Sequence, residues 1–142
     1  MAAILVVEDN PQNLKLTTII LESAGHLVVP AHDADEAERA IEAAVPDLVV
    51  MDISLPGRDG YALTRTLRAA AATAHLPILV VTALAMPGDA RKAFEAGASG
   101  YVTKPIRRAT LLDQVATLLP PSGAPDLGAT RTEPWVPEEE KN

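Results

Sequence analysis

The stretch Leu48-Val49-Val50-Met51-Asp52 decides how this chain is built. Its continuous apolar run, rich in β-branched residues, predicts a strand that is buried on both faces. The run ends on a carboxylate, and Ser54-Leu55-Pro56-Gly57 turns the chain away directly behind it. Open α/β folds bind ligands at the carboxyl ends of such strands. Asp52 is therefore expected at the binding edge of a sheet.

Two further apolar runs end in the same way. Ile4-Leu5-Val6-Val7 leads into Glu8-Asp9, and Ile78-Leu79-Val80-Val81 leads into Thr82. Because the carboxyl ends of parallel strands meet at one edge of a sheet, we expect these polar groups to lie beside Asp52. Four polar side chains at the ends of three buried strands predict a functional site.

The rest of residues 3–119 alternates between strand patterns and helix patterns. Asn10-Pro11 supplies an N-cap residue and a proline at the first helical position, and Gly25 is a natural helix stop. The expected helices span about residues 11–24, 33–44, 59–71, 88–97 and 107–119, with shorter strands near 27–29 and 101–103. Five strand–helix repeats predict an α/β fold, with a parallel sheet, helices on both faces and right-handed crossovers.

The third expected helix has a clear inner face. Leu63, Leu67 and Ala71 recur at four-residue spacing, which places them on one side of the helix. Arg65 and Arg68 are interpreted as members of the solvated face.

Composition limits the classes to which the chain can belong. Its 142 residues suit one domain, and 48 % apolar residues suffice for a core that must be aliphatic, because 3 % are aromatic. The absence of cysteine excludes disulfides and thiolate chemistry. A net charge of −7 without a basic stripe argues against direct DNA or RNA binding. No apolar stretch approaches the roughly 20 residues of a membrane span, and no signal-peptide pattern precedes the first strand, so a cytoplasmic location is expected.

Residues 120–142 differ in composition from the rest. They contain five of the twelve prolines, an acidic run at Glu138–Glu140 and few large apolar side chains. Such a segment cannot bury enough surface to offset its chain entropy, so we expect a disordered, proline-rich acidic tail after a domain of residues 1–119. Trp135 lies in Pro134-Trp135-Val136-Pro137 and is interpreted either as an incidental residue or as a docking anchor.

The expected cluster of acids points to a divalent cation. Glu8, Asp9 and Asp52 at neighbouring strand ends would raise one another's pKa values by repulsion. A few carboxylates together with water and phosphate are typical ligands of Mg²⁺. Lys104, after the last expected strand, adds a cation able to reach a phosphoryl oxygen, and Thr82 adds a hydroxyl donor. These are the groups that phosphoryl transfer needs, because positioning and charge stabilisation do most of its catalytic work.

Taken in order, the motifs resemble the receiver domains of two-component response regulators. The resemblance covers about residues 3–119 and implies a flavodoxin-like (βα)5 sandwich, doubly wound, with strand order 2-1-3-4-5. The motifs that carry it are Val7-Glu8-Asp9-Asn10, Met51-Asp52-Ile53-Ser54-Leu55-Pro56, Asp59-Gly60, Thr82-Ala83, Gly97-Ala98 and Lys104-Pro105. Within the family, Glu8-Asp9-Asn10 and Thr82-Ala83-Leu84-Ala85-Met86 look most like single-domain regulators of the cell-fate and polarity type.

The resemblance implies a phosphoacceptor and a metal site. Asp52 would accept a phosphoryl group from a phosphohistidine. Asp9 and Asp52 would ligate Mg²⁺, Glu8 would act through water, and Ser54 would contribute its backbone carbonyl. Glu8 departs from the commoner aspartate, and its longer side chain is expected to shift the water-mediated contact.

The resemblance also implies a switch. Lys104 would bind a phosphoryl oxygen, and its peptide bond to Pro105 would be cis. Thr82 would move toward the phosphoryl group, and Tyr101 would then move from exposed to buried. That movement would change the surface formed by the last two expected helices and the strand between them. An ordinary half-buried strand tyrosine is the alternative interpretation of Tyr101.

The implied partners are a sensor histidine kinase or a histidine phosphotransfer protein, and a downstream protein target. The chain would be a monomer or a weak dimer through the switched surface, and a phosphoacceptor rather than an enzyme. A phosphorelay intermediate and a phosphate sink are alternatives of the same class. An unphosphorylated scaffold is a third, although it should have lost an acid, Thr82 or Lys104.

Two other classes fit the residues less well. A phosphatase of the haloacid-dehalogenase type would need a second aspartate where Ser54 stands. A flavin or dinucleotide binder would need a phosphate-binding loop rich in glycine, serine or threonine where Glu8-Asp9-Asn10-Pro11 stands.

Overall fold

A five-stranded parallel sheet forms the centre of the computed structural model. The strands are β1 (Ala3–Val7), β2 (Leu27–Ala31), β3 (Leu48–Asp52), β4 (Ile78–Thr82) and β5 (Gly100–Thr103). Their order across the sheet is β2-β1-β3-β4-β5, and every neighbouring pair is parallel. The predicted fold class and strand order are therefore confirmed.

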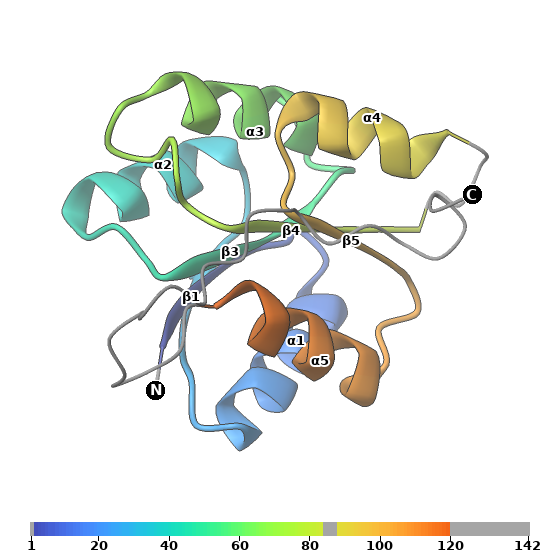
Figure 1. Cartoon of the computed structure of the whole chain (residues 1–142). Helices are drawn as coiled ribbons and strands as arrows, with labels where there is room; N and C mark the ends of the chain where they lie inside the picture. Colours follow the sequence, from blue (N-terminus) through green and yellow to red (C-terminus); the bar gives the residue numbers. More distant parts are fainter. Residues whose placement is uncertain (1, 84–87, 120–142) are drawn as a thin grey trace, which may run out of the picture.

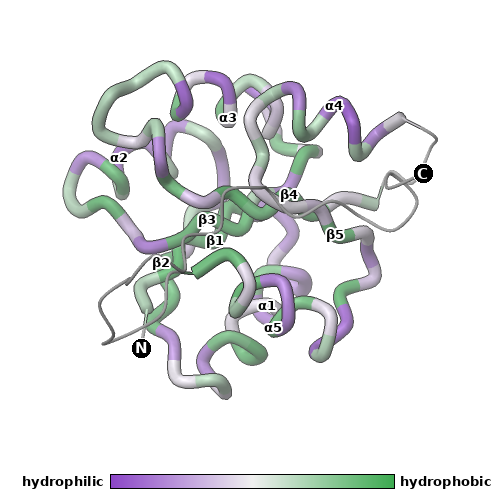
Figure 2. The backbone as a smooth tube through the Cα atoms, in the orientation of Figure 1, coloured by the Kyte–Doolittle hydropathy of each residue, from purple (hydrophilic) through white to green (hydrophobic). Residues whose placement is uncertain are grey.

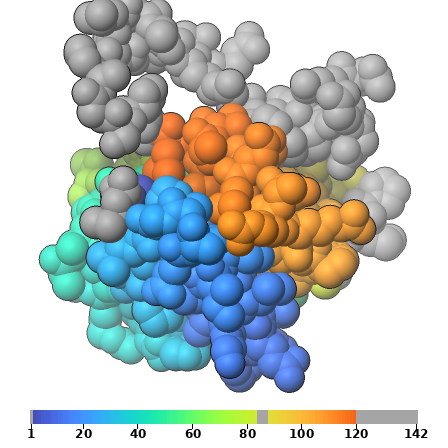
Figure 3. Space-filling model, turned by 90° about the horizontal axis from the view of Figure 1, so that it is seen from below, coloured from blue at the N-terminus to red at the C-terminus, as the bar shows by residue number. Residues whose placement is uncertain are grey.

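Helices cover both faces of this sheet (Figure 1). The helices α2 (Ala34–Ala43), α3 (Gly60–Ala69) and α4 (Asp89–Ala96) lie on one face, and α1 (Pro11–Ser23) and α5 (Arg108–Leu118) lie on the other. Figure 3 shows α1 and α5 side by side at the surface. Arg108 joins them, because its guanidinium donates to Ser23 Oγ of α1 at 2.7 Å.

The structure describes residues 2–83 and 88–119. The predicted tail 120–142 with Trp135, and the motif residues Leu84, Ala85 and Met86, lie outside these residues. Within the described part, no helix is long and apolar enough to cross a bilayer.

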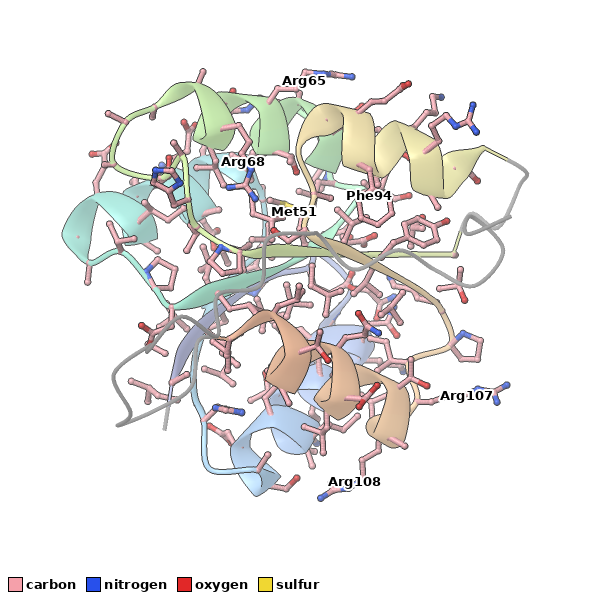
Figure 4. The ribbon with its side chains drawn as sticks, viewed as in Figure 1. Met51, Arg65, Arg68, Phe94, Arg107 and Arg108 are labelled. Carbon is pink, nitrogen blue, oxygen red and sulfur yellow. The ribbon has the colours of Figure 1, made fainter. Side chains whose placement is uncertain are left out.

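The core consists of two apolar layers, one on each face of the sheet. β3 and β4 are buried along their whole length, as the continuous apolar runs predicted. Their side chains alternate, so that Val49 and Met51 join the layer under α2, α3 and α4, whereas Leu48 and Val50 join the layer over α1 and α5. In Figure 2 the sheet is accordingly the most hydrophobic part of the chain, and in Figure 4 Met51 points toward the α3–α4 side.

The strand register brings the polar strand ends together. Val7 pairs with Met51, so the residue after β1 lies beside Asp52. Asp52 pairs with Val81, and Thr82 pairs with Thr103, so the ends of β4 and β5 follow at the same level. The parallel sheet therefore places the polar groups at its strand ends next to one another along a single edge.

The edge strand β2 is longer than expected and contains a proline. Leu27 N donates to Ala2 O at 2.9 Å, and Ala31 O accepts from Glu8 N at 2.9 Å, so the odd-numbered residues of β2 bond toward β1. Pro30 is even-numbered, and its nitrogen therefore faces away from the sheet. A proline is tolerated there because no ladder hydrogen bond is lost.

Two expectations for the third helix are wrong. α3 ends at Ala69, so Ala71 lies beyond the helix and is exposed. Arg68 is partly buried, and in Figure 4 it points toward the sheet whereas Arg65 extends into solvent. Its bonds explain this, because its guanidinium donates to Gly97 O at 2.7 Å, Leu76 O at 2.5 Å and Ser99 Oγ at 3.0 Å.

Arg68 thereby joins α3 to the start of β4 and to the turn between α4 and β5. Ser99 Oγ also accepts from Ile78 N at 3.0 Å, which extends the network into β4. Burial lowers the pKa of Arg68, and its positive charge is balanced by carbonyl dipoles, including Gly97 O at the carboxyl end of α4.

Replacing Arg68 with alanine should lower the free energy of unfolding by about 2–3 kcal/mol, because buried carbonyl oxygens lose a charged donor. Arg65→Ala removes the same side chain from the exposed face of the same helix and should change that free energy by less than about 0.5 kcal/mol. Urea denaturation followed by circular dichroism measures both. Equal losses in the two variants would show that the Arg68 bonds contribute no stability.

Candidate functional site

Three carboxylates meet at the carboxyl edge of the sheet. Glu8 and Asp9 follow β1, and Asp52 ends β3; one carboxylate oxygen from each lies within 4.8 Å of the others. Glu8 and Asp52 are 4 % and 3 % exposed, whereas Asp9 is exposed. Two buried acids at this separation repel each other strongly unless a cation lies near them.

Lys104 supplies a positive charge to this cluster. It follows β5, and its Nζ lies 2.9 Å from Glu8 Oε1 and 3.3 Å from Asp52 Oδ2. Burial by itself disfavours the ammonium, but the hydrogen bond to Glu8 and the charge of Asp52 outweigh it and raise the pKa of Lys104. Burial and the neighbouring Asp52 carboxylate raise the pKa of Glu8, although Lys104 opposes the rise.

Backbone N–H groups orient the two buried acids. Asn10 N donates to Glu8 Oε2 at 3.1 Å, and Ser54 N donates to Asp52 Oδ1 at 3.2 Å. Asn10 itself caps α1, since its side chain accepts from Gln12 N and Asn13 N. The start of α1 and the turn after β3 therefore fix one oxygen of each carboxylate.

The turn between β3 and α3 is held from two sides. Gly60 N donates to Ile53 O at 2.9 Å, and Gly60 lies so close to β3 that an added Cβ would be 2.4 Å from Asp52 O. On the outer side, the Arg58 guanidinium pairs with Glu38 and, at 3.3 Å, with Asp35, both on α2. Sequence reasoning missed the Arg58 pairs, because nothing in the spacing relates that turn to α2.

The remaining predicted residues lie on β4 and β5. Thr82 ends β4 and is fully buried, and its carbonyl accepts from Lys104 N at 2.8 Å. The peptide bond between Lys104 and Pro105 is cis. Tyr101 is 5 % exposed and belongs to the core layer under α2, α3 and α4, so it is not part of the acidic cluster.

The cluster suits a hard divalent cation. Its donors are carboxylate oxygens from neighbouring strand ends, with the exposed Asp9 toward solvent and the buried Asp52 inside. Oxygen donors of this kind, completed by water, match the coordination that Mg²⁺ prefers. The residues present therefore fit the metal that the sequence pattern predicted.

A flavodoxin-like sheet whose strand ends gather several acids and one lysine is typical of the receiver class of α/β domains. The family described as "Response regulator receiver domain" matches residues 4–116 of this sequence. The chain belongs to that family.

Individual relatives agree with this assignment. The protein PilH of Pseudomonas aeruginosa is 35 % identical over 119 residues, which is 84 % of this chain and 98 % of PilH. The polar-differentiation response regulator DivK of Brucella ovis is 32 % identical over 117 residues, which is 82 % of this chain and 95 % of DivK.

A solved structure is similar in three dimensions. The receiver domain of the sensor histidine kinase PA1611 from Pseudomonas aeruginosa, with a magnesium ion coordinated in its active site cleft, has a TM-score of 0.76 and 37 % identity to this chain. The likeness covers 82 % of this chain and 96 % of that one.

Gly60→Ala should lower the free energy of unfolding by about 3 kcal/mol, because the new methyl group overlaps the Asp52 carbonyl and the backbone must move. It should also shift the amide resonances of residues 52–54 in an NMR spectrum. Gly25→Ala is the control. Gly25 has a φ of +91° and open space around an added Cβ, so this substitution should lower stability through backbone strain and without a steric overlap. Unchanged resonances at 52–54 in Gly60→Ala would contradict the close approach.

The raised pKa of Glu8 predicts a pH dependence of stability. The folded chain holds this proton more tightly than the unfolded chain, so the free energy of unfolding should fall as pH rises from the ordinary glutamate range through the raised pKa of Glu8. Glu8→Gln removes the titration and should show a smaller fall in the presence of EDTA. Glu22→Gln, an exposed acid on α1, should follow the wild type, and parallel profiles for all three proteins would rule out the effect.

Proposed function

We propose that this chain is a single-domain response regulator that accepts a phosphoryl group on Asp52 and passes the signal on by protein–protein contact. The donor is a phosphohistidine of a sensor histidine kinase or of a histidine phosphotransfer protein. The observation that carries the proposal is the placement of Asp52, buried within 4.8 Å of two further carboxylates and 3.3 Å from Lys104.

In the proposed reaction an Asp52 carboxylate oxygen attacks the phosphorus atom. The new O–P bond forms an acyl phosphate, while the P–N bond breaks and its electron pair returns to the imidazole of the donor. Asp9, Asp52 and the carbonyl of Ser54 would hold Mg²⁺ directly, and Glu8 through water. When bound, the metal supplies positive charge to the phosphoryl oxygens.

Lys104 neutralises charge on the protein side of the reaction. Its ammonium is close to Asp52 already and needs a short movement to reach a phosphoryl oxygen on that residue. The Ser54 N–H donates to the other oxygen of Asp52 and thereby aims the carboxylate. Positioned charges and donors of this kind supply most of the rate acceleration in phosphoryl transfer.

The phosphoryl group then acts as a switch. Thr82 donates its hydroxyl to a phosphoryl oxygen, and Tyr101 on β5 responds. Tyr101 is buried in this structure, which is the position that the family resemblance associates with the phosphorylated form. Its two positions would alter the surface formed by α4, β5 and α5, through which the chain meets a downstream protein or a second copy in a weak dimer.

The relatives favour output through protein contact. The match covers 98 % of PilH and 95 % of DivK, so the receiver domain makes up nearly the whole of both proteins. We place this chain in the cytoplasm with its kinase and assign it neither a nucleic-acid partner nor turnover of a metabolite. As an intermediate in a phosphorelay or a phosphate sink it would use the same residues.

Incubation with acetyl phosphate and Mg²⁺ should add the mass of one phosphoryl group to the wild type, and EDTA or Asp52→Asn should prevent it. Asp113→Asn, which removes an exposed acid on α5, should be phosphorylated like the wild type. Intact-protein mass spectrometry measures the adduct, and beryllofluoride binding reports on the same site. An adduct that persists in Asp52→Asn would reject the mechanism.

A further inference from the structure

The turn between β3 and α3 carries two groups that the proposed reaction uses. Ser54 N donates to Asp52 Oδ1 at 3.2 Å, and the carbonyl of the same residue is the proposed backbone ligand of Mg²⁺. Ser54 itself is exposed, so the positions of both groups depend on how firmly the turn is held. A contact that holds this turn therefore acts on the phosphoacceptor and on the metal together.

The two halves of the turn are held differently. In the inner half, Ile53 and Leu55 are buried in the core, and Leu55 N donates to Ile53 O at 3.0 Å. The outer half, residues 56–58, is packed loosely, because an added Cβ on Gly57 would meet nothing within 4 Å. Among residues 2–83 and 88–119, no backbone hydrogen bond joins this outer half to another element.

Arg58 attaches the outer half to α2 through its side chain. Its guanidinium pairs with Glu38 and, at 3.3 Å, with Asp35. The two acids lie three residues apart and therefore on the same side of α2. The side chains of Arg58 and Glu38 are 32 % and 33 % exposed, so this pair is partly shielded from water.

The start of α2 is a firm base for this attachment. Asp33 accepts from Glu36 N at 2.8 Å, and the Glu36 carboxylate accepts from His32 N at 3.0 Å, so the two side chains cap the helix reciprocally. The helix also buries Ala37 and Ile41 in the core. A side chain that pairs with α2 is thus tied to an element that is itself held in place.

We propose that Arg58 is a positioning residue, which closes the β3–α3 turn onto α2 and thereby holds Ser54 where it serves both Asp52 and Mg²⁺. The inference rests on the proposed function of the site. The three acids of the cluster follow β1 or end β3, so this ion pair gives α2 a part in metal binding without a ligand of its own.

Charge and position predict opposite effects of losing Arg58. A guanidinium near the acidic edge repels a divalent cation, so its removal should by itself strengthen Mg²⁺ binding. A loosened turn should instead weaken binding, because the Ser54 carbonyl must then be ordered when the metal binds. The direction of the change in affinity distinguishes the two effects.

Isothermal titration calorimetry measures the Mg²⁺ affinity of the wild type, Arg58→Gln, Glu38→Gln and the double variant, without any phosphoryl donor. Each single variant should bind Mg²⁺ about two- to fivefold more weakly, the range expected for one partly exposed ion pair. The double variant should lose no more than a single one, because the pair is already broken. Arg39→Gln, which removes an exposed positive charge from α2 outside the pair, should not weaken binding.

The amide resonance of Ser54 reports on the turn in the absence of metal. In an NMR spectrum it should move in Arg58→Gln and in Glu38→Gln toward the same position, and it should stay in place in Arg39→Gln. All variants are compared at a temperature at which circular dichroism shows them to be folded, so that a general loss of structure is not read as a loss of position.

The two proposals fail separately. Unchanged or tighter Mg²⁺ binding by Arg58→Gln, additive losses in the double variant, or an unmoved Ser54 resonance would overturn the role of Arg58 even if Asp52 is phosphorylated normally. A wild type that binds no Mg²⁺ and forms no adduct on Asp52 would instead remove the proposed function, and the role of Arg58 with it.

Discussion

Repulsion between buried carboxylates is the constraint around which this molecule is organised. Glu8 and Asp52 lie side by side at the ends of neighbouring strands, because Val7 pairs with Met51 and each acid is the next residue along its strand. The sheet thus holds together two charges that would separate in a flexible chain. Lys104 and two backbone N–H groups offset the repulsion in part, and the remaining negative charge suits this edge of the sheet to binding a cation.

Contacts at both ends of the strands hold the surrounding structure in place against this charge repulsion. At the edge that carries the acids, Gly60 lets α3 begin directly against Asp52, and Arg58 ties the same turn to α2. At the opposite edge, Arg68 joins α3, β4 and the turn before β5. The Arg68 bonds therefore anchor the helices α3 and α4 far from the acids. When the charge at the acidic cluster changes, these bonds help to hold the two helices in place.

Much of the fold and most of the acidic cluster could be predicted from local patterns. Val49 to Asp52 was recognisable because a strand buried on both faces has a continuous apolar run, and parallel strands place their carboxyl ends together. Arg68 was misjudged because helical spacing groups it with Arg65, while the carbonyls that it bonds come from distant turns. The closer partner of Lys104 depended on side-chain length and burial, which the order of residues does not reveal.

Pro30 has a consequence for how this protein behaves among its own copies. An open sheet can grow by adding a strand from another molecule, and such growth leads to aggregates. The outward-facing nitrogen of Pro30 carries no hydrogen to offer an incoming strand, so the β2 margin is a poor template. Within residues 2–83 and 88–119, the missing N–H of Pro30 thus protects this edge strand against pairing with another molecule, which favours separate molecules over fibres.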